Sequence, residues 1–191
     1  MEEADTLKLL EELRIKAERC TKCPLSATRK KVVFGEGGVR LRVMMIGEAP
    51  GREEDAQGKP FVGRAGKLLD EILHNLGVGR ENIYITNVVK CRPPGNRPPR
   101  RSEVEACEEY LLGQFSAIKP RLVMLLGGIA LKAILGEHYS ITYIRGRHIV
   151  KEGVVFLPTL HPASALYNPK NRELIEEDIR KFKALLDELN Q

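Results

Sequence analysis

Apolar residues along the chain follow two spacings, one typical of amphipathic helices and one typical of buried strands. Spacings of three and four residues place Leu7, Leu10, Leu13 and Ala17 on one face and predict a helix over residues 6–19. Short runs rich in β-branched or large apolar residues predict buried strands over 40–46, 82–89 and 121–126, and two further β-rich runs flank the Glu152-Gly153 turn within 147–160. Further helices are predicted over 65–76, from Ser102 onward, from the Gly127-Gly128 turn to Gly136, and over 171–189.

Two of these helices carry boundary signals. Gly77 directly follows the predicted helix 65–76, where glycine readily takes the left-handed conformation that ends a helix. Ser102 is followed three residues later by Glu105, which predicts a capping box at the start of that helix.

Strands that alternate with helices predict an α/β fold with a mostly parallel sheet covered by helices on both faces. The chain of 191 residues shows no repeat or linker, so a single domain over 1–191 is expected. In such sheets ligands bind beyond the carboxyl ends of the strands. The turn after residue 46, the segment after 89 and the segment after 160 should therefore meet in one cleft.

Composition is that of a folded globular protein, with 42% hydrophobic and 30% charged residues. No apolar run approaches the roughly 20 residues that cross a bilayer, and the acidic N-terminus is unlike a secretory signal. A cytoplasmic protein is expected, and the wealth of Lys, Arg and Glu would suit a thermophile.

The net charge of +5 favours a polyanionic partner, and its distribution favours one more strongly. Four arginines and a lysine lie between residues 90 and 101 with no acidic residue among them. This basic segment predicts nucleic-acid contacts, although a solvated surface loop is the alternative. Its candidate DNA-binding residues are Arg92, Arg97, Arg100 and Arg101.

Four cysteines suggest a metal site. Cys20 and Cys23 form a C-x-x-C pair after the first helix, and Cys91 and Cys107 follow far downstream. Stable disulfides are not expected in the cytoplasm, so four thiolates could hold zinc or an iron–sulfur cluster. Spacing alone does not separate these two, and four unrelated buried thiols are a third interpretation.

The segment "IGEAPGREEDAQGKPFVGRAGKLL" raises the question of what a glycine-rich turn with carboxylates would bind. It lacks the Gly-Lys-Ser/Thr ending of a phosphate loop, and its acids would repel phosphate. Phe61 could stack on a planar ring, Asn87 could read the polar edge of a pyrimidine, and His161 could stabilise a leaving anion. Glu48 and Asp55 could position water.

Each of these residues also has an ordinary structural interpretation. Phe61 could be a core aromatic, Asn87 a turn cap, and His161 a brace for its loop. Only their expected arrangement at three strand ends favours a pocket for a base flipped out of DNA.

The segments "GEAPGREEDAQGKPFVGRAGKLL", "ITNVVKCRPPGNRPP" and "HPASAL" resemble the signature segments of family 4 uracil-DNA glycosylases, the thermostable iron–sulfur family. The resemblance covers nearly the whole chain. It implies an α/β sandwich with a central four-stranded parallel sheet, excision of uracil from single- or double-stranded DNA, and one structural 4Fe-4S cluster. The cluster would brace the N-terminal segment and the 91–107 region.

The resemblance also implies roles for individual residues. Uracil contacts are implied for Gly47, Glu48, Ala49, Phe61, Asn87 and His161, cluster ligation for Cys20, Cys23, Cys91 and Cys107, and insertion into the duplex for Leu166. Better-known uracil glycosylases carry Asp and Tyr where this chain has Ala49 and Gly51. We therefore expect Glu48, with Asp55 second, to take over catalytic water placement and exclusion of thymine.

Two other functions share some of these features. A non-catalytic iron–sulfur DNA-binding module would use the basic segment, Phe61 and the cysteines without needing His161. A metal-dependent phosphoesterase would use the carboxylates and would lose its activity in EDTA. For the glycosylase we expect a nucleoid-associated monomer, with a sliding clamp as a candidate partner.

Overall fold

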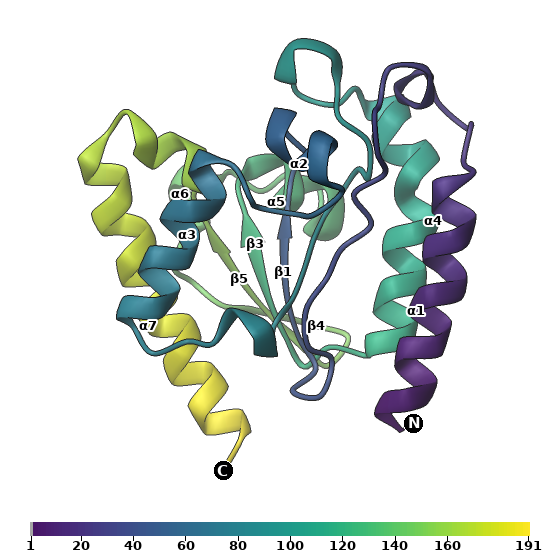
Figure 1. The fold of residues 1–191 in the computed structure, drawn as a ribbon. Helices are drawn as coiled ribbons and strands as arrows, with labels where there is room; N and C mark the ends of the chain where they lie inside the picture. Colours follow the sequence, from purple (N-terminus) through teal and green to yellow (C-terminus); the bar gives the residue numbers. More distant parts are fainter. Residues whose placement is uncertain (1) are drawn as a thin grey trace.

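The protein folds as a sheet between two layers of helices in a computed structural model that describes residues 2–191 (Figure 1). The strands are β1 (Val43–Gly47), β2 (Tyr84–Asn87), β3 (Leu122–Leu126), β4 (Ile149–Lys151) and β5 (Val154–Thr159). The α-helices are α1 (Glu3–Glu18), α2 (Arg52–Gln57), α3 (Arg64–Asn75), α4 (Arg101–Ile118), α5 (Gly128–Leu135), α6 (Ile141–Ile144) and α7 (Pro169–Leu189). Short 3-10 turns complete the fold as η1 (Pro24–Ala27), η2 (Arg80–Asn82), η3 (Pro94–Asn96) and η4 (Pro162–Leu166).

The sheet has the order β2-β1-β3-β5-β4. β1, β2, β3 and β5 are parallel, whereas β4 pairs with β5 in the antiparallel sense. The mostly parallel α/β fold is therefore confirmed, but the sheet has five strands where the family resemblance implied four. The fifth strand is the first arm of the hairpin around Glu152 and Gly153, whose tight turn brings it beside β5.

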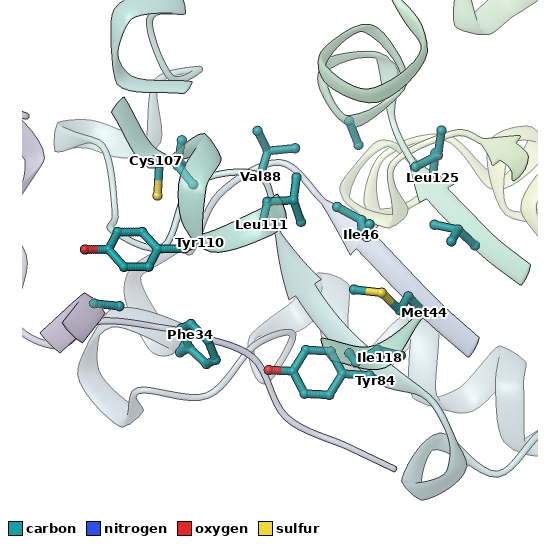
Figure 2. Packing of buried hydrophobic residues seen from close by; sticks show 14 of the residues in the cluster. Phe34, Met44, Ile46, Tyr84, Val88, Cys107, Tyr110, Leu111, Ile118 and Leu125 are labelled. Atoms are coloured by element: carbon teal, nitrogen blue, oxygen red, sulfur yellow. The ribbon is translucent and has the colours of Figure 1, made fainter. Parts of the chain in front are cut away.

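Both faces of the sheet are buried, which explains why the central strands are apolar without alternation. Met44 and Ile46 of β1 face the core beneath α1 and α4, while Val43 and Met45 face the core beneath α3 and α7. Figure 2 shows the first of these cores, with Cys107 at its margin. Among residues 2–191, no helix is both long and apolar enough to cross a membrane.

The start of α4 corrects one prediction from the sequence. The helix begins at Arg101, and Glu103 rather than Glu105 accepts a hydrogen bond from the backbone N–H of Arg100 at 2.7 Å. Glu105 instead pairs with Arg101 on the surface. Ser102 therefore lies inside the helix, and the boundary signal was displaced by two residues.

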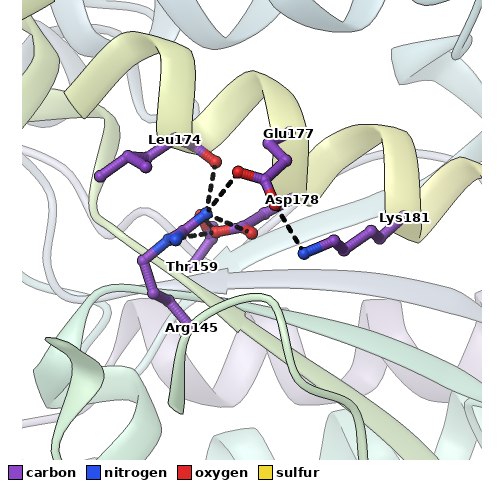
Figure 3. A network of polar contacts seen from close by, with 6 residues as sticks. All are labelled: Arg145, Thr159, Leu174, Glu177, Asp178 and Lys181. Carbon is purple, nitrogen blue, oxygen red and sulfur yellow. Dashed lines mark hydrogen bonds and ion pairs between the residues drawn. The ribbon is translucent and has the colours of Figure 1, made fainter. Parts of the chain in front are cut away.

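A buried polar network joins α7 to the end of β5 (Figure 3). Asp178 of α7 accepts two hydrogen bonds from Arg145, at 2.7 and 3.0 Å, and one from the hydroxyl of Thr159 at 2.7 Å. Because Thr159 is the last residue of β5, this network holds the strand from which His161 emerges.

Candidate active site at the carboxyl edge of the sheet

A cavity of about 490 Å³ opens at the carboxyl ends of the parallel strands, where the sequence predicted a cleft. Its walls come from the turn after β1, the start of α3, the end of β2, the 93–97 segment and the loop after β5. The residues that line it include Glu48, Ala49, Phe61, Asn87, His161 and Leu166. Three distant segments of the chain thus meet at one place.

Asn87 occupies the floor of the cavity beside Gly47, its register partner in the sheet. A Cβ atom on Gly47 would lie 2.5 Å from the Phe61 ring and 2.6 Å from Asn87 Oδ1, so only glycine fits between them. The Asn87 side chain is 2% exposed, and its Oδ1 is the only buried side-chain oxygen or nitrogen in residues 2–191 without a hydrogen-bond partner. Buried acceptors are almost always paired, so this one is available to a ligand donor.

His161 lies beside Phe61 in the wall of the cavity, with the two rings stacked and their centroids 5.8 Å apart. Its Nδ1 accepts a hydrogen bond from the backbone N–H of Ala163 at 3.1 Å, which leaves the ring proton of the neutral form on Nε2. Burial lowers the pKa of His161 to about 4, against a smaller opposing effect of the Glu54 carboxylate. His161 is therefore neutral near pH 7 and presents one N–H donor.

The three candidate carboxylates lie in different surroundings. Glu48 lines the cavity, and burial raises its pKa. Asp55 is 2% exposed, lies outside the cavity and accepts hydrogen bonds from the backbone N–H groups of Lys30 and Lys31. The structure thus does not bring Asp55 into the cavity, and its Oδ1 instead binds the preceding loop to α2.

Glu54 is a cavity residue that the sequence did not single out. Its Oε1 accepts hydrogen bonds from the backbone N–H groups of Val62 at 2.9 Å and Gly63 at 2.8 Å. The run of acids at 53–55 was the only signal. Which of its members faces the cavity depends on the rotation of α2, which the spacing alone does not reveal.

The basic segment divides into paired and free arginines. Arg97 lines the cavity but forms a two-point ion pair with Glu103, whose side chain is 1% exposed. Arg101 forms an exposed pair with Glu105, and Arg92 donates to Asn96 Oδ1 at 2.7 Å. Arg100 is exposed on the surface.

The rim of the cavity also carries an aromatic residue. Tyr167 is 82% exposed, and the Arg64 guanidinium lies 5.8 Å from the centre of its ring. Leu166 and Arg64 both line the cavity. The rim thus presents an aliphatic, an aromatic and a cationic side chain together.

A second cavity contains all four cysteines. Cys20, Cys23, Cys91 and Cys107 line it together, although they come from the end of α1, the start of η1, the segment after β2 and the middle of α4. Arg29 lies beside them and donates to the Cys91 sulfur at 3.4 Å and to the Cys20 carbonyl at 2.8 Å. Burial raises the pKa of Cys107 to about 11.

Lys90 lines the cavity of the four cysteines and is 1% exposed. Its ammonium donates hydrogen bonds to the Asn87 carbonyl, the Thr86 hydroxyl and the Gln114 amide oxygen, at 2.6 to 2.7 Å. Burial lowers the pKa of Lys90 to about 7. The residue connects the end of β2 with α4 in the protein interior.

Comparison with known proteins agrees with this geometry. Residues 34–189 match the family model of the uracil DNA glycosylase superfamily. A type-4 uracil-DNA glycosylase of Sulfurisphaera tokodaii is 46% identical over 92% of this chain and 84% of its own length. One of Thermotoga maritima is 45% identical over 94% of this chain and 95% of its own length. The chain belongs to the type-4 uracil-DNA glycosylases.

The chain is also similar, at lower identity, to glycosylases of another type. A type-5 uracil-DNA glycosylase of Pyrobaculum aerophilum is 33% identical over 66% of this chain and 63% of its own length. The superfamily match begins after Cys20 and Cys23, whereas the match with the Thermotoga protein extends over almost the whole chain. The family predicted from the sequence is therefore confirmed.

Proposed function

We propose that the protein removes uracil from DNA by hydrolysing the bond between uracil N1 and the sugar C1′, leaving an abasic site. Base excision repair is the process this reaction serves. The flipped base would lie against Phe61, with the Gly47–Ala49 turn along one edge. Asn87 would bind the polar edge of the ring, and His161 would face a ring carbonyl.

The unpaired Oδ1 of Asn87 carries the proposal. Uracil offers an N–H donor at N3 beside a carbonyl acceptor at C4, and the asparagine amide offers the complementary acceptor and donor. Cytosine lacks that N–H at N3, so it would leave the buried oxygen unpaired. A buried acceptor without a partner costs about 1–3 kcal/mol, which disfavours cytosine in the pocket.

The chemistry follows from the charges that develop. As the N-glycosidic bond breaks, the sugar gains positive character and the electron pair of the bond passes to the uracil ring. The neutral His161 can donate its Nε2–H to the carbonyl oxygen on which negative charge accumulates. Water then adds at C1′ and gives up a proton, and uracil leaves as an anion that is protonated in solvent.

Incubation of the purified protein with a uracil-containing oligonucleotide in EDTA, followed by alkali, tests this function. Strand breaks should appear only after alkali, and oligonucleotides with thymine or cytosine at the same position should stay intact. Breaks without alkali would indicate an added lyase step, and loss of activity in EDTA would indicate a metal-dependent phosphoesterase. Binding without release of uracil would favour the non-catalytic module.

Glu48 is the residue that we propose excludes the thymine methyl group and helps to place water. A Glu48→Ala variant should lose at least tenfold in uracil release, about 1.4 kcal/mol of barrier, and should begin to accept thymine. The physical reason is its position in the cavity wall, which in this proposal lies against the 5-position of the bound base. The measurement is kcat/KM on matched uracil and thymine oligonucleotides.

Glu188→Ala, an exposed carboxylate on α7 outside the cavity, is the matched control. A Glu48→Ala protein with full activity and unchanged rejection of thymine would remove Glu48 from this role.

For DNA binding we propose that Arg92, Arg100 and Arg101 contact phosphates and that Leu166 enters the duplex where the base has left. The ion pair between Arg101 and Glu105 is exposed and contributes little, so a phosphate can replace the carboxylate. Arg97 is different because its partner Glu103 is buried. Its main contribution would be to hold the shape of the basic segment.

The four-cysteine cavity is proposed to hold a structural 4Fe-4S cluster. A single zinc ion with zinc–sulfur bonds of about 2.3 Å would require sulfurs about 3.8 Å apart. Among residues 2–191, no group of three or more Cys, His, Asp or Glu side chains is arranged to hold a single metal ion. Thiolates that each bind a separate iron are spaced more widely, and the cationic Arg29 beside them would offset their charge. The four cysteines around one cavity and the membership in the type-4 family support the cluster.

The cluster would connect the N-terminal segment to α4, so a Cys107→Ser variant should lose both the cluster and stability. We expect wild-type protein purified anaerobically to be brown and to contain iron and acid-labile sulfide in equal amounts. The variant should lose both and unfold with at least about 3 kcal/mol less stability, a large effect for one substitution. Zinc without sulfide, or neither metal nor sulfide, would contradict the cluster.

Nucleoid association, a monomeric state and a sliding-clamp partner stay predictions from the sequence. The net charge of +5 supports association with DNA.

A further inference from the structure

Phe61 has a backbone conformation that is unusual for its residue type. Its φ is +50°, in the left-handed region that large L-residues rarely adopt. The residue is 5% exposed and its ring lies in the cavity wall, stacked beside His161. Backbone strain at such a position persists only when neighbouring groups hold it there.

Arg80 binds this strained backbone from one side. Its guanidinium donates to the carbonyl of Phe61 at 2.9 Å and to the carbonyl of Pro60 at 2.6 Å. It is itself held by Asp70 of α3 at 2.5 Å. Arg80 lies in η2, outside the residues that line the cavity, so it does not contact the base.

Glu54 binds the same turn from the other side through the backbone N–H groups of Val62 and Gly63. α3 also approaches closely, because a Cβ atom on Gly66 would lie 2.0 Å from the Phe61 carbonyl oxygen. Arg80 therefore holds the backbone carbonyls of Pro60 and Phe61, and Glu54 holds the backbone N–H groups of the two residues that follow. These contacts determine the direction in which the Phe61 ring points.

We propose that Arg80 is a positioning residue for the base pocket, which acts by holding Phe61 in its left-handed conformation. This inference rests on the proposed function, in which the Phe61 ring stacks on the uracil. Without Arg80 the Pro60–Phe61 segment can relax toward an ordinary backbone conformation, and the ring leaves the plane against which the base would lie.

A double-mutant cycle tests whether Arg80 acts through Phe61. Arg80→Met should lower kcat/KM for uracil-containing DNA about tenfold. In a Phe61→Ala background the same substitution should change kcat/KM less than twofold, because there is no ring left to position. Equal losses in both backgrounds would overturn the proposal. Arg121→Met is the matched control, since Arg121 also donates to a backbone carbonyl, that of Leu189, outside the cavity.

A spectroscopic readout separates this proposal from the proposed function. The chain has five phenylalanines, so fluorophenylalanine labelling should give few ¹⁹F resonances, and that of Phe61 is identified by its absence in Phe61→Ala. In Arg80→Met the Phe61 resonance should shift and broaden while the others stay in place. Urea titration would establish that the variant is folded under these conditions.

An unchanged Phe61 resonance in folded Arg80→Met protein would overturn the positioning role whether or not the chain excises uracil. A shifted resonance in a protein without glycosylase activity would instead contradict the proposed function and leave the positioning role intact. Arg80→Lys, which keeps the charge but not the two-point geometry, should recover the wild-type spectrum only in part.

Discussion

An Asn87→Leu variant should lose at least a hundredfold in kcat/KM for uracil-containing DNA, about 2.7 kcal/mol of transition-state stabilisation, while folding at least as stably as the wild type. Leucine has nearly the shape of asparagine but neither its donor nor its acceptor. The activity falls because the polar edge of the flipped base would face an apolar side chain.

Stability should not fall with activity, because the side-chain amide oxygen of Asn87, Oδ1, is buried without a hydrogen-bond partner. An unsatisfied acceptor of this kind costs about 1–3 kcal/mol, which leucine would relieve. The backbone carbonyl of Asn87, which accepts from Lys90, is unchanged by the substitution. Urea unfolding monitored by circular dichroism measures the stability, and cleavage of uracil oligonucleotides measures the activity.

Asn82→Leu, at an exposed position before β2, is the control and should keep wild-type activity. If Asn87→Leu kept its activity, the amide would not read the base. If Asn87→Leu instead lost several kcal/mol of stability, the Asn87 side chain would have a partner within the protein. Its Oδ1 would then not be free to bind a base.

Replacement of His161 by alanine should slow cleavage at least tenfold, and by up to about a thousandfold if the imidazole is the main donor to the uracil anion. The neutral ring has its proton on Nε2 because Nδ1 accepts the N–H of Ala163. His161→Gln, which can still donate a hydrogen bond, should lie between the wild type and His161→Ala. Wild-type rates from His161→Ala would exclude the residue from the mechanism.

The pH dependence gives a separate check on the state of His161. Its pKa of about 4 lies below the ordinary value near 6.5, so the ring stays neutral as pH falls from 8 to 5. A plot of log kcat/KM against pH should therefore show no inflection near pH 6.5 that is due to His161. The wild-type and His161→Ala profiles should have the same shape in this range. An inflection of that kind would mean that the imidazole titrates normally and that burial does not keep it neutral.

The elements of the fold were largely predictable because each central strand is an apolar run bounded by polar turns. β1 and β3 lie within the predicted runs or one residue beyond them, and α3 differs from its predicted bounds by one residue at each end. The start of α4 was misplaced because Glu103 and Glu105 give similar local signals. Only the folded backbone shows that Glu103 is the carboxylate that reaches the N–H of Arg100.

Some site residues could likewise be predicted from the sequence, and others could not. Asn87 ends β2 and His161 lies two residues after β5, so the parallel sheet brings them together once its direction is known. Asp55 and Glu54 are adjacent in a helix of six residues, and helix rotation turns one toward the preceding loop and the other toward the cavity. Arg80 lies 19 residues from Phe61, and no spacing rule connects the two.

By itself the sequence determined the α/β class, the family and the chemical types of the pocket, because apolar periodicity and combined motifs are local properties that survive without coordinates. Tertiary structure alone decided which charged groups face the base and which hold the backbone. That choice depends on side chains from distant segments competing for the same few buried polar atoms, and such competition is resolved only when the chain has packed.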